Sequence, residues 1–175
     1  MAVPDGRRDG GDEDAAALFD EEGMELAEED DIEHSEIPLH LRPLVSAAES
    51  GDLNALRLAL ESFNGNIDEP MEDGDTLLHL TCLYGHLPCV QFLLERGANL
   101  EAKDEDGGIP LHDACAGGYT EIAQLIISRA SNPERVKRML ETVDTEGDTT
   151  PTELADPGTE ARRILEEAMA VVSSN

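Results

Sequence analysis

The chain has 175 residues, a length that fits about one domain and a tail, and its formal net charge is −28. Such an acidic surface repels the phosphate backbone that nucleic-acid-binding proteins hold with Lys and Arg, so we expect no direct binding to nucleic acid. Hydrophobic residues make up 39% of the chain but aromatic residues only 3%, which predicts a core of Leu, Ile, Val and Ala.

Cysteine content and hydropathy indicate the cellular setting. The three cysteines, Cys82, Cys89 and Cys115, cannot all be paired in disulfides, and the first residues are acidic instead of basic and then apolar. No apolar run approaches the roughly 18 residues that a membrane-spanning helix needs. We expect a monomeric protein of the cytoplasm or the nucleus that does not insert into membranes.

Residues 1–38 form the first segment with a composition of its own. They include fifteen Asp or Glu and two Arg. A segment of this kind buries too little apolar surface to offset its chain entropy, so it is predicted to be a disordered acidic region. Within it, apolar residues alternate with acids over 15–26, a pattern that is compatible with a transient amphipathic helix. A solvated acidic tail is the favoured interpretation of the two.

The sequence after residue 38 repeats itself. Leu-His-Leu-Thr-Cys at 78–82 recurs thirty-three residues later as Leu-His-Asp-Ala-Cys at 111–115, and apolar or small residues of 44–60 match those of 78–94 at an offset of thirty-four. Repetition at such a period is the signature of stacked repeat proteins. Three units are therefore visible.

Each unit is predicted to contain two short helices. In the middle unit these cover 77–84 and 87–96, and each is followed by a glycine, Gly85 or Gly97, that can adopt positive φ. The segment 99–108 is rich in Asp, Glu and Gly and is predicted to be an exposed turn. Because two short helices cannot form a core alone, the units must stack.

The motifs in these units resemble the ankyrin repeat. Gly-Asp-Thr-Leu-Leu-His at 74–79 and Gly-Gly-Ile-Pro-Leu-His at 107–112 are similar to the G-x-T-P-L-H opening of that family, and Gly-Ala-Asn at 97–99 is similar to its close. The departures are small, with Leu in the place of Pro and Ile in the place of Thr. The resemblance covers about 41–168 and implies an all-α ankyrin-repeat solenoid, made of helix-turn-helix units with hairpin-like loops.

The last units depart from the period. Residues 109 and 150, which begin equivalent motifs, are forty-one residues apart, and the extra residues near 132–141 are predicted to extend a helix or add a short one. Two repeat openings also follow each other directly at 147–151, which suggests that one whole repeat is missing relative to a longer form. The predicted organisation is an acidic region 1–38 and an ankyrin-repeat domain 39–175, divided into a capping unit 39–70, a repeat 71–103, an extended repeat 104–145 and a C-terminal capping unit 146–172.

Two His-x-x-Cys pairs offer the ligand types that zinc prefers. They are His79 with Cys82 and His112 with Cys115. Equivalent positions of stacked repeats are related mainly by translation, so these side chains are not expected to converge on one metal ion. The resemblance implies instead that each histidine is a buried residue that hydrogen-bonds neighbouring turns. The acidic turns also lack the ligand spacing of an EF-hand, and no metal is predicted.

No enzymatic motif accompanies these residues. The sequence lacks the G-x-S-x-G, G-x-x-x-x-G-K-[ST] and G-x-G-x-x-G patterns of nucleophile, phosphate and dinucleotide sites. The carboxylates fall in solvated turns, and the cysteines fall at small-residue core positions where packing is the simpler role. We expect no catalysis and no cofactor.

The remaining candidate is a protein-binding surface. In the ankyrin family partners dock on the turn tips and the first helices, along the concave face of the stack. Tyr84 is the best single anchor, although a half-buried contact between repeats is an equal alternative for it. Carried over by position, the candidate residues are Glu72, Asp73, Asp75, Leu83, Tyr84, Glu105, Asp106, Gly108, Asp113 and Ala116.

The predicted function is that of an adaptor or regulator that binds proteins through this face. Because the tips are nearly all acidic, a complementary partner presents a basic surface, although acidic tips also serve solubility alone. Two alternatives stay open: an acidic chaperone or targeting factor for client proteins, and a transcriptional co-regulator that uses the acidic tail.

Overall fold

The structure is a computed structural model that describes residues 37–145 and 147–174. The chain divides into two units, Met1–Pro38 and Leu39–Asn175, and the description below concerns the second, which we call the repeat domain. The disorder and the amphipathic helix expected within 1–38 lie outside the described residues, apart from the last two positions of that segment.

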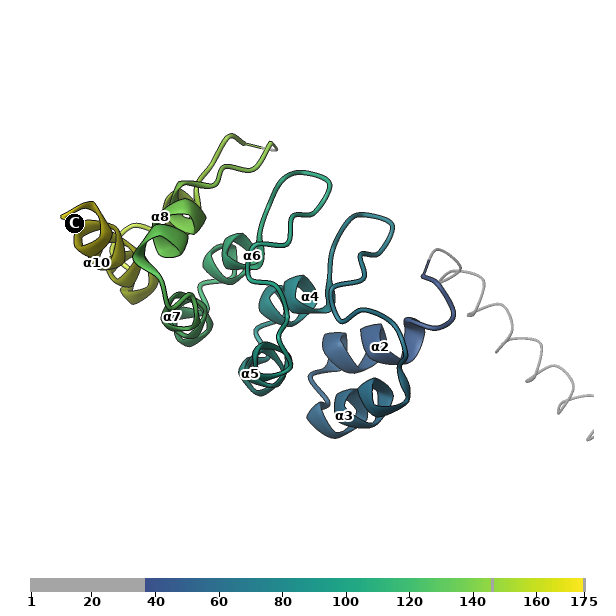
Figure 1. Cartoon of the computed structure of the whole chain (residues 1–175). Helices are drawn as coiled ribbons and strands as arrows, with labels where there is room; N and C mark the ends of the chain where they lie inside the picture. The colour runs from purple at the N-terminus through teal and green to yellow at the C-terminus, as the bar shows by residue number, and fades with distance from the viewer. Residues whose placement is uncertain (1–36, 146, 175) are drawn as a thin grey trace, which may run out of the picture. The chain divides into compact units, whose positions relative to one another are not determined.

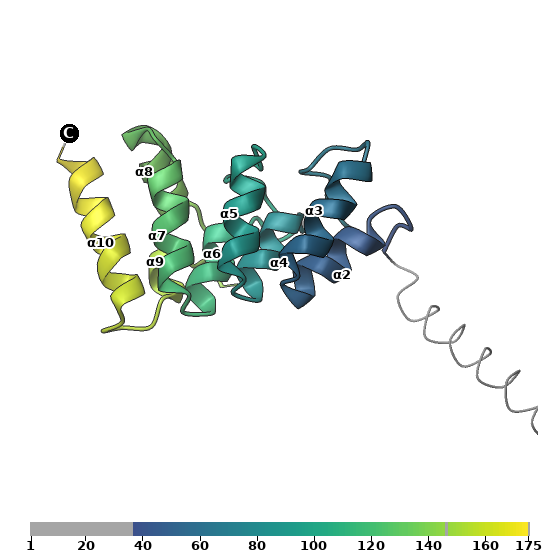
Figure 2. The same ribbon diagram turned by 90° about the horizontal axis from the view of Figure 1, so that it is seen from below.

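The repeat domain is a row of helix pairs, as expected for an all-α stack. Figure 1 shows α2, α4 and α6 in one layer and α3, α5 and α7 in a second, and Figure 2 shows α3, α5, α7 and α10 side by side. The helices are α2 (Arg42–Ser50), α3 (Leu53–Ser62), α4 (Leu77–Leu83), α5 (Leu87–Glu95), α6 (Pro110–Ala116), α7 (Thr120–Arg129), α8 (Pro133–Glu141), α9 (Pro151–Leu154) and α10 (Glu160–Ser173).

Glycines end the helices where the sequence places them. The helices α4 and α5 end within one residue of the predicted positions, at Leu83 and Glu95. Gly85 and Gly97 follow with φ of 76° and 88°, a conformation that a residue with a Cβ adopts only at a cost. The chain therefore reverses after each helix, which keeps the pairs short and antiparallel.

The core consists of aliphatic side chains between neighbouring pairs. Leu56, Leu93 and Leu111 are at most 1% exposed, and burying each such side chain contributes about 1.5–3 kcal/mol. Cys82, Cys89 and Cys115 are free thiols inside the same core. Burial raises the pKa of all three thiols, so they stay protonated and act as small apolar residues.

The extra residues of the third unit form a separate helix, α8. Its start is fixed by Asn132, whose side-chain oxygen accepts from the Glu134 N–H at 2.8 Å. Met139 and Leu140 are buried where α8 packs on α10. The expectation of an added short helix is confirmed.

The doubled opening at 147–151 occupies a single loop. In the preceding loop Asp104 Oδ1 accepts from the N–H groups of residues 106 and 108, at +2 and +4. Asp144 Oδ1 accepts from Gly147 and Thr149, at +3 and +5, so this turn is one residue longer. Asp148 takes up the positive φ, at 52°. The longer turn explains the doubled motif, and the missing repeat stays an untested hypothesis.

Three long loops, which we call the tip loops, project from the same edge of the domain (Figure 1). They comprise residues 63–76, 96–109 and 142–150. Their backbones are joined in register, because Glu105 N–H donates to the Asp73 carbonyl at 3.0 Å and Thr145 N–H donates to the Asp106 carbonyl at 2.7 Å. The loops therefore form one stacked surface.

Two buried histidines tie the tip loops to the helices. The Nδ1 of His79 accepts from the Thr76 N–H at 3.1 Å, which caps α4, and its Nε2 contacts the Gly108 carbonyl at 3.3 Å. Since Nδ1 is an acceptor, the proton must lie on Nε2, which donates to Gly108. His112 repeats this arrangement with the N–H of residue 109 and the Thr149 carbonyl. The structural role implied for both histidines is confirmed.

No helix in the described ranges is both long enough and apolar enough to cross a membrane.

The histidine bridge gives a stability prediction. His79→Ala leaves a cavity and an unpaired Thr76 N–H, and it removes one of the two bonds to the Gly108 carbonyl, so we expect the free energy of unfolding to fall by about 3 kcal/mol. His40→Ala is the control, because His40 is exposed and bonded to Glu69 at the surface, where a pair contributes at most about 1 kcal/mol. Urea denaturation measures both, and equal losses would contradict the bridging role.

Candidate protein-binding surface

Most of the predicted contact residues lie on the tip loops and at the ends of the first helices. We call the exposed members the inner face: Glu72, Asp73, Leu83, Tyr84, Glu105 and Ala116. Asp75, Asp106 and Asp113 are only partly exposed. The backbone bond between Asp73 and Glu105 and the packing of α4 against α6 bring the two units of this surface together.

Gly108 does not belong to the exposed surface. It is buried, its N–H donates to Asp104 Oδ1 at 2.8 Å, and its carbonyl accepts from Asp104 N–H and from His79. All its polar atoms are used within the fold. The expectation that this residue contacts a partner is therefore contradicted by its burial, because a glycine here serves the close approach of the Asp104 carboxylate.

Asp75, in the first tip loop, and Asp113, on α6, are two partly buried acids with raised pKa values. Burial, together with the charges of Asp73, Asp104 and Glu105, raises the pKa of Asp75 to about 7. Burial, followed by the charges of Asp75 and Asp104, raises the pKa of Asp113 to about 8. One buried oxygen of Asp113, Oδ2, has no hydrogen-bond partner in the described part of the chain. No cationic side chain of the described ranges is among the groups that shift the pKa values of these two carboxyls.

One group of side chains has the composition of a metal site. Ligand atoms of Asp75, His79 and Asp104 lie within 4.8 Å of one another. Both nitrogens of His79 are already occupied by Thr76 and Gly108, and burial lowers the pKa of His79. Asp104 Oδ1 already accepts two backbone N–H groups. A metal ion here would break the bonds that cap α4 and shape the second tip loop, so these residues do not fit one.

Two exposed side chains add apolar area beside the acids. Leu83 is 43% exposed and Tyr84 is 47% exposed, both at the C-terminal end of α4. The ring of Tyr84 stacks on His86, with the centroids 6.3 Å apart. The His86 Nε2 in turn contacts the Glu49 carbonyl at 2.8 Å. The contact with His86 thus holds one side of the Tyr84 ring, while nearly half of the side chain is exposed to solvent. Aromatic interface anchors have this property.

Sequence reasoning missed the acids that organise the loops. Asp104 and Asp144 were not singled out, although each carboxylate holds a whole tip loop. Thr145, which joins the third tip loop to the second, was missed as well. The available signal was an Asp three residues before the turn glycine in each of the two later loops, at 104 before Gly107 and at 144 before Gly147, but the many other acids of these loops hid it.

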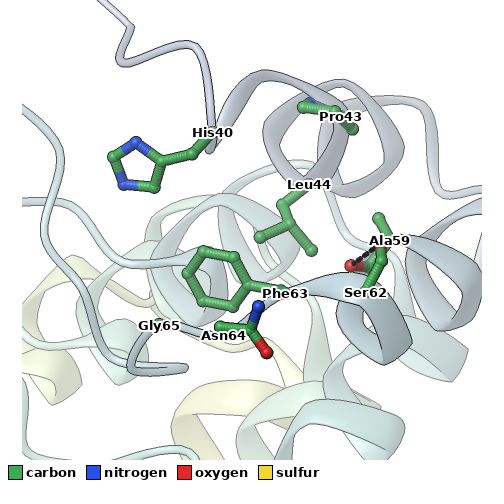
Figure 3. Close-up of a pocket in the computed structure, with 8 residues that line it drawn as sticks. All are labelled: His40, Pro43, Leu44, Ala59, Ser62, Phe63, Asn64 and Gly65. Atoms are coloured by element: carbon green, nitrogen blue, oxygen red, sulfur yellow. Dashed lines mark hydrogen bonds between the residues drawn. The ribbon is translucent and has the colours of Figure 1, made fainter.

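A pocket lies at the N-terminal end of the repeat domain. Figure 3 shows it between α2 and α3, with the rings of His40 and Phe63 nearly parallel at 6.2 Å. Leu44 and Ala59 line its floor. His40 is its one ionisable side chain and is bonded to Glu69. The lining thus offers no pair of groups for acid–base or nucleophilic chemistry.

A family model described as "Ankyrin repeats (3 copies)" matches residues 44–137, more than half of the chain. The chain belongs to the ankyrin-repeat family. The resemblance seen in the motifs is thereby confirmed. Ankyrin repeats are protein-interaction modules, and the matched family is not a catalytic one.

Curated relatives of this ankyrin-repeat protein match about half of it. They include the Ankyrin repeat and SOCS box protein 2 of Mus musculus, 33% identical over 88 residues, and that of Bos taurus, 37% identical over 87 residues. Each match covers 50% of this chain and 13% of the relative. The similarity is therefore to a small part of longer proteins.

The raised pKa of Asp113 gives a prediction on stability and pH. Its ordinary pKa is 3.8 and its folded value is about 8, so between these values the unfolded chain has lost a proton that the folded chain keeps. The wild type therefore loses stability as pH rises through this window. Asp113→Asn should raise the free energy of unfolding at pH 8 by about 1–2 kcal/mol and have little effect near pH 4.

Urea denaturation of both proteins at the two pH values measures this difference. Glu121→Gln is the control, because Glu121 is exposed on α7 and its charge is not one of those that raise the pKa of Asp75 or Asp113, so its substitution should leave the pH dependence unchanged. A gain for Asp113→Asn that is the same at both pH values would show that Asp113 is ionised in the folded protein, contrary to the account.

Proposed function

We propose that this ankyrin-repeat protein is an adaptor or regulator that binds a partner protein through the inner face, and that the partner presents a basic surface. The observation that carries the proposal is that the same repeats present stacked acidic loops and, at the C-terminal end of α4, two exposed apolar side chains, Leu83 and Tyr84. An interface anchor needs apolar area, and the surrounding charges select the partner.

The fixed geometry of the loops supports binding without large rearrangement. The Asp73–Glu105 and Asp106–Thr145 bonds and the two histidine bridges hold the loops in place before any partner arrives. A surface that is ordered in advance loses less entropy when it binds. The loops therefore favour recognition of a defined partner over a loose electrostatic association.

Charge at this edge favours a cation. Burial, followed by the charges of nearby carboxylates, raises the pKa of both Asp75 and Asp113. A Lys or Arg of the partner that comes close to them favours their charged forms and offsets part of the cost of burial. Association should then be fast and should weaken with salt, since exposed charges are screened beyond about 8 Å at physiological ionic strength.

The proposal predicts which variants lose partners. Tyr84→Ala with Glu105→Lys removes the anchor and reverses one exposed charge, so proteins that bind the inner face should be lost in affinity capture from a native extract. Val171→Ala with Glu167→Lys is the matched control on α10, because Val171 is 65% exposed and Glu167 is an exposed acid. Circular dichroism checks that both variants fold.

Quantitative mass spectrometry of the captured proteins separates the outcomes. Loss from the inner-face variant alone supports the proposal. Equal capture by wild type and both variants would contradict it, and loss from the control alone would move the interface to α10. The chaperone and co-regulator alternatives rest on residues 1–38, nearly all of which lie outside the described residues, and they stay predictions.

A further inference from the structure

A second charged surface involves α3 and the junction between α5 and the second tip loop. Phe92 of α5 has two arginines over its ring: the guanidinium carbons of Arg57, from α3, and Arg96, at the end of α5, are each 4.9 Å from the ring centroid. Both guanidiniums are therefore within about 10 Å of each other. Stacking on the ring restricts the motion of both side chains.

These two arginines lack carboxylate partners among the described residues. Arg135 and Arg138 are bonded to Glu101, and Arg162 and Arg163 are bonded to acids of α10. Arg57 and Arg96 make neither a hydrogen bond nor an ion pair through their side chains within the described ranges. In a chain with a net charge of −28, two neighbouring arginines without an acid are unusual.

An exposed apolar side chain follows one of these arginines along α3. Leu58 is 67% exposed, and it follows Arg57 on α3. Asn54 and Glu61 are also exposed, so the spacing of three and four residues places Leu58 and Arg57 on the solvent side of that helix. Phe92 itself is nearly covered by the two guanidiniums, at 6% exposure.

We propose that Arg57, Leu58, Phe92 and Arg96, which we call the arginine patch, form a second docking surface that binds an acidic segment of a partner protein. The carboxylates of that segment pair with the two guanidiniums, and one apolar side chain packs on Leu58. Arginine suits this task because its planar fork donates two parallel hydrogen bonds to a carboxylate.

Charge complementarity favours this occupant over other anions. The rest of the domain repels acidic chains, so an acidic segment is held only where arginines are free of internal partners. A nucleic acid extends its phosphates over many bases and would meet the acidic surface around the patch. A short peptide with a few carboxylates and an apolar residue fits the limited size of the patch.

The test is a titration of the isotope-labelled full chain with a short synthetic peptide of alternating Glu and Leu, followed by NMR at physiological salt. We expect the Nε–H resonances of Arg57 and Arg96 to shift, and those of Arg162 and Arg163 to stay unchanged. Arg57→Gln with Arg96→Gln should weaken peptide binding by about tenfold or more, since arginines are frequent interface hot spots. Arg163→Gln, which removes a charge paired within α10, should not.

Other results would overturn the proposal. If the arginines only shield Phe92, the double variant loses thermal stability. The peptide then either fails to bind the wild type, or binds the double variant as well as it binds the wild type. Shifts of the same two resonances by a single-stranded oligonucleotide, with none by the peptide, would assign the patch to another class of partner.

A charge reversal gives a supporting result. The variant Arg57→Glu with Arg96→Glu should reject the Glu and Leu peptide and bind a peptide of alternating Lys and Leu at the same site, which would confirm the charge pairing.

Discussion

The neutral buried histidine is the constraint on which the repeat domain depends. His79 caps its own helix through Nδ1 and reaches the next tip loop through Nε2, and His112 does the same one repeat later. Burial keeps the imidazole of His79 neutral, because its pKa is lowered, and only the neutral ring can accept and donate at once. The same contact therefore joins helix capping, the spacing of repeats and the shape of the binding loops.

Two charged features of this domain differ in sign. The tip loops carry exposed acids, and burial together with nearby carboxylates raises the pKa of Asp75 and Asp113 close to them. The second helices carry arginines, two of which stack on Phe92 without an acid. Acidic loops and a pair of stacked arginines are two different binding chemistries on one repeat stack, and each selects a partner of opposite charge.

The sequence predicted what depends on local pattern. Helix ends followed Gly85 and Gly97, the added helix followed the spacing, and the histidine role followed the family motif. The sequence did not predict contacts between residues that lie far apart in the chain. The link between Asp73 and Glu105, the effect of Asp75 on the pKa of Asp113, and the burial of Gly108 arise only when repeats stack. The stacking of Arg57 and Arg96 on one ring is of the same kind.

The most direct test of the central claim is photo-crosslinking from the inner face. A photoreactive phenylalanine replaces Tyr84 in one protein and Val171 in another, since both side chains are exposed but lie on α4 and α10 respectively. After irradiation in native extract, the account predicts crosslinked partner peptides rich in Lys and Arg from position 84 and none of these from position 171. Crosslinks to the same partner from position 171 alone would contradict the inner face as the binding surface.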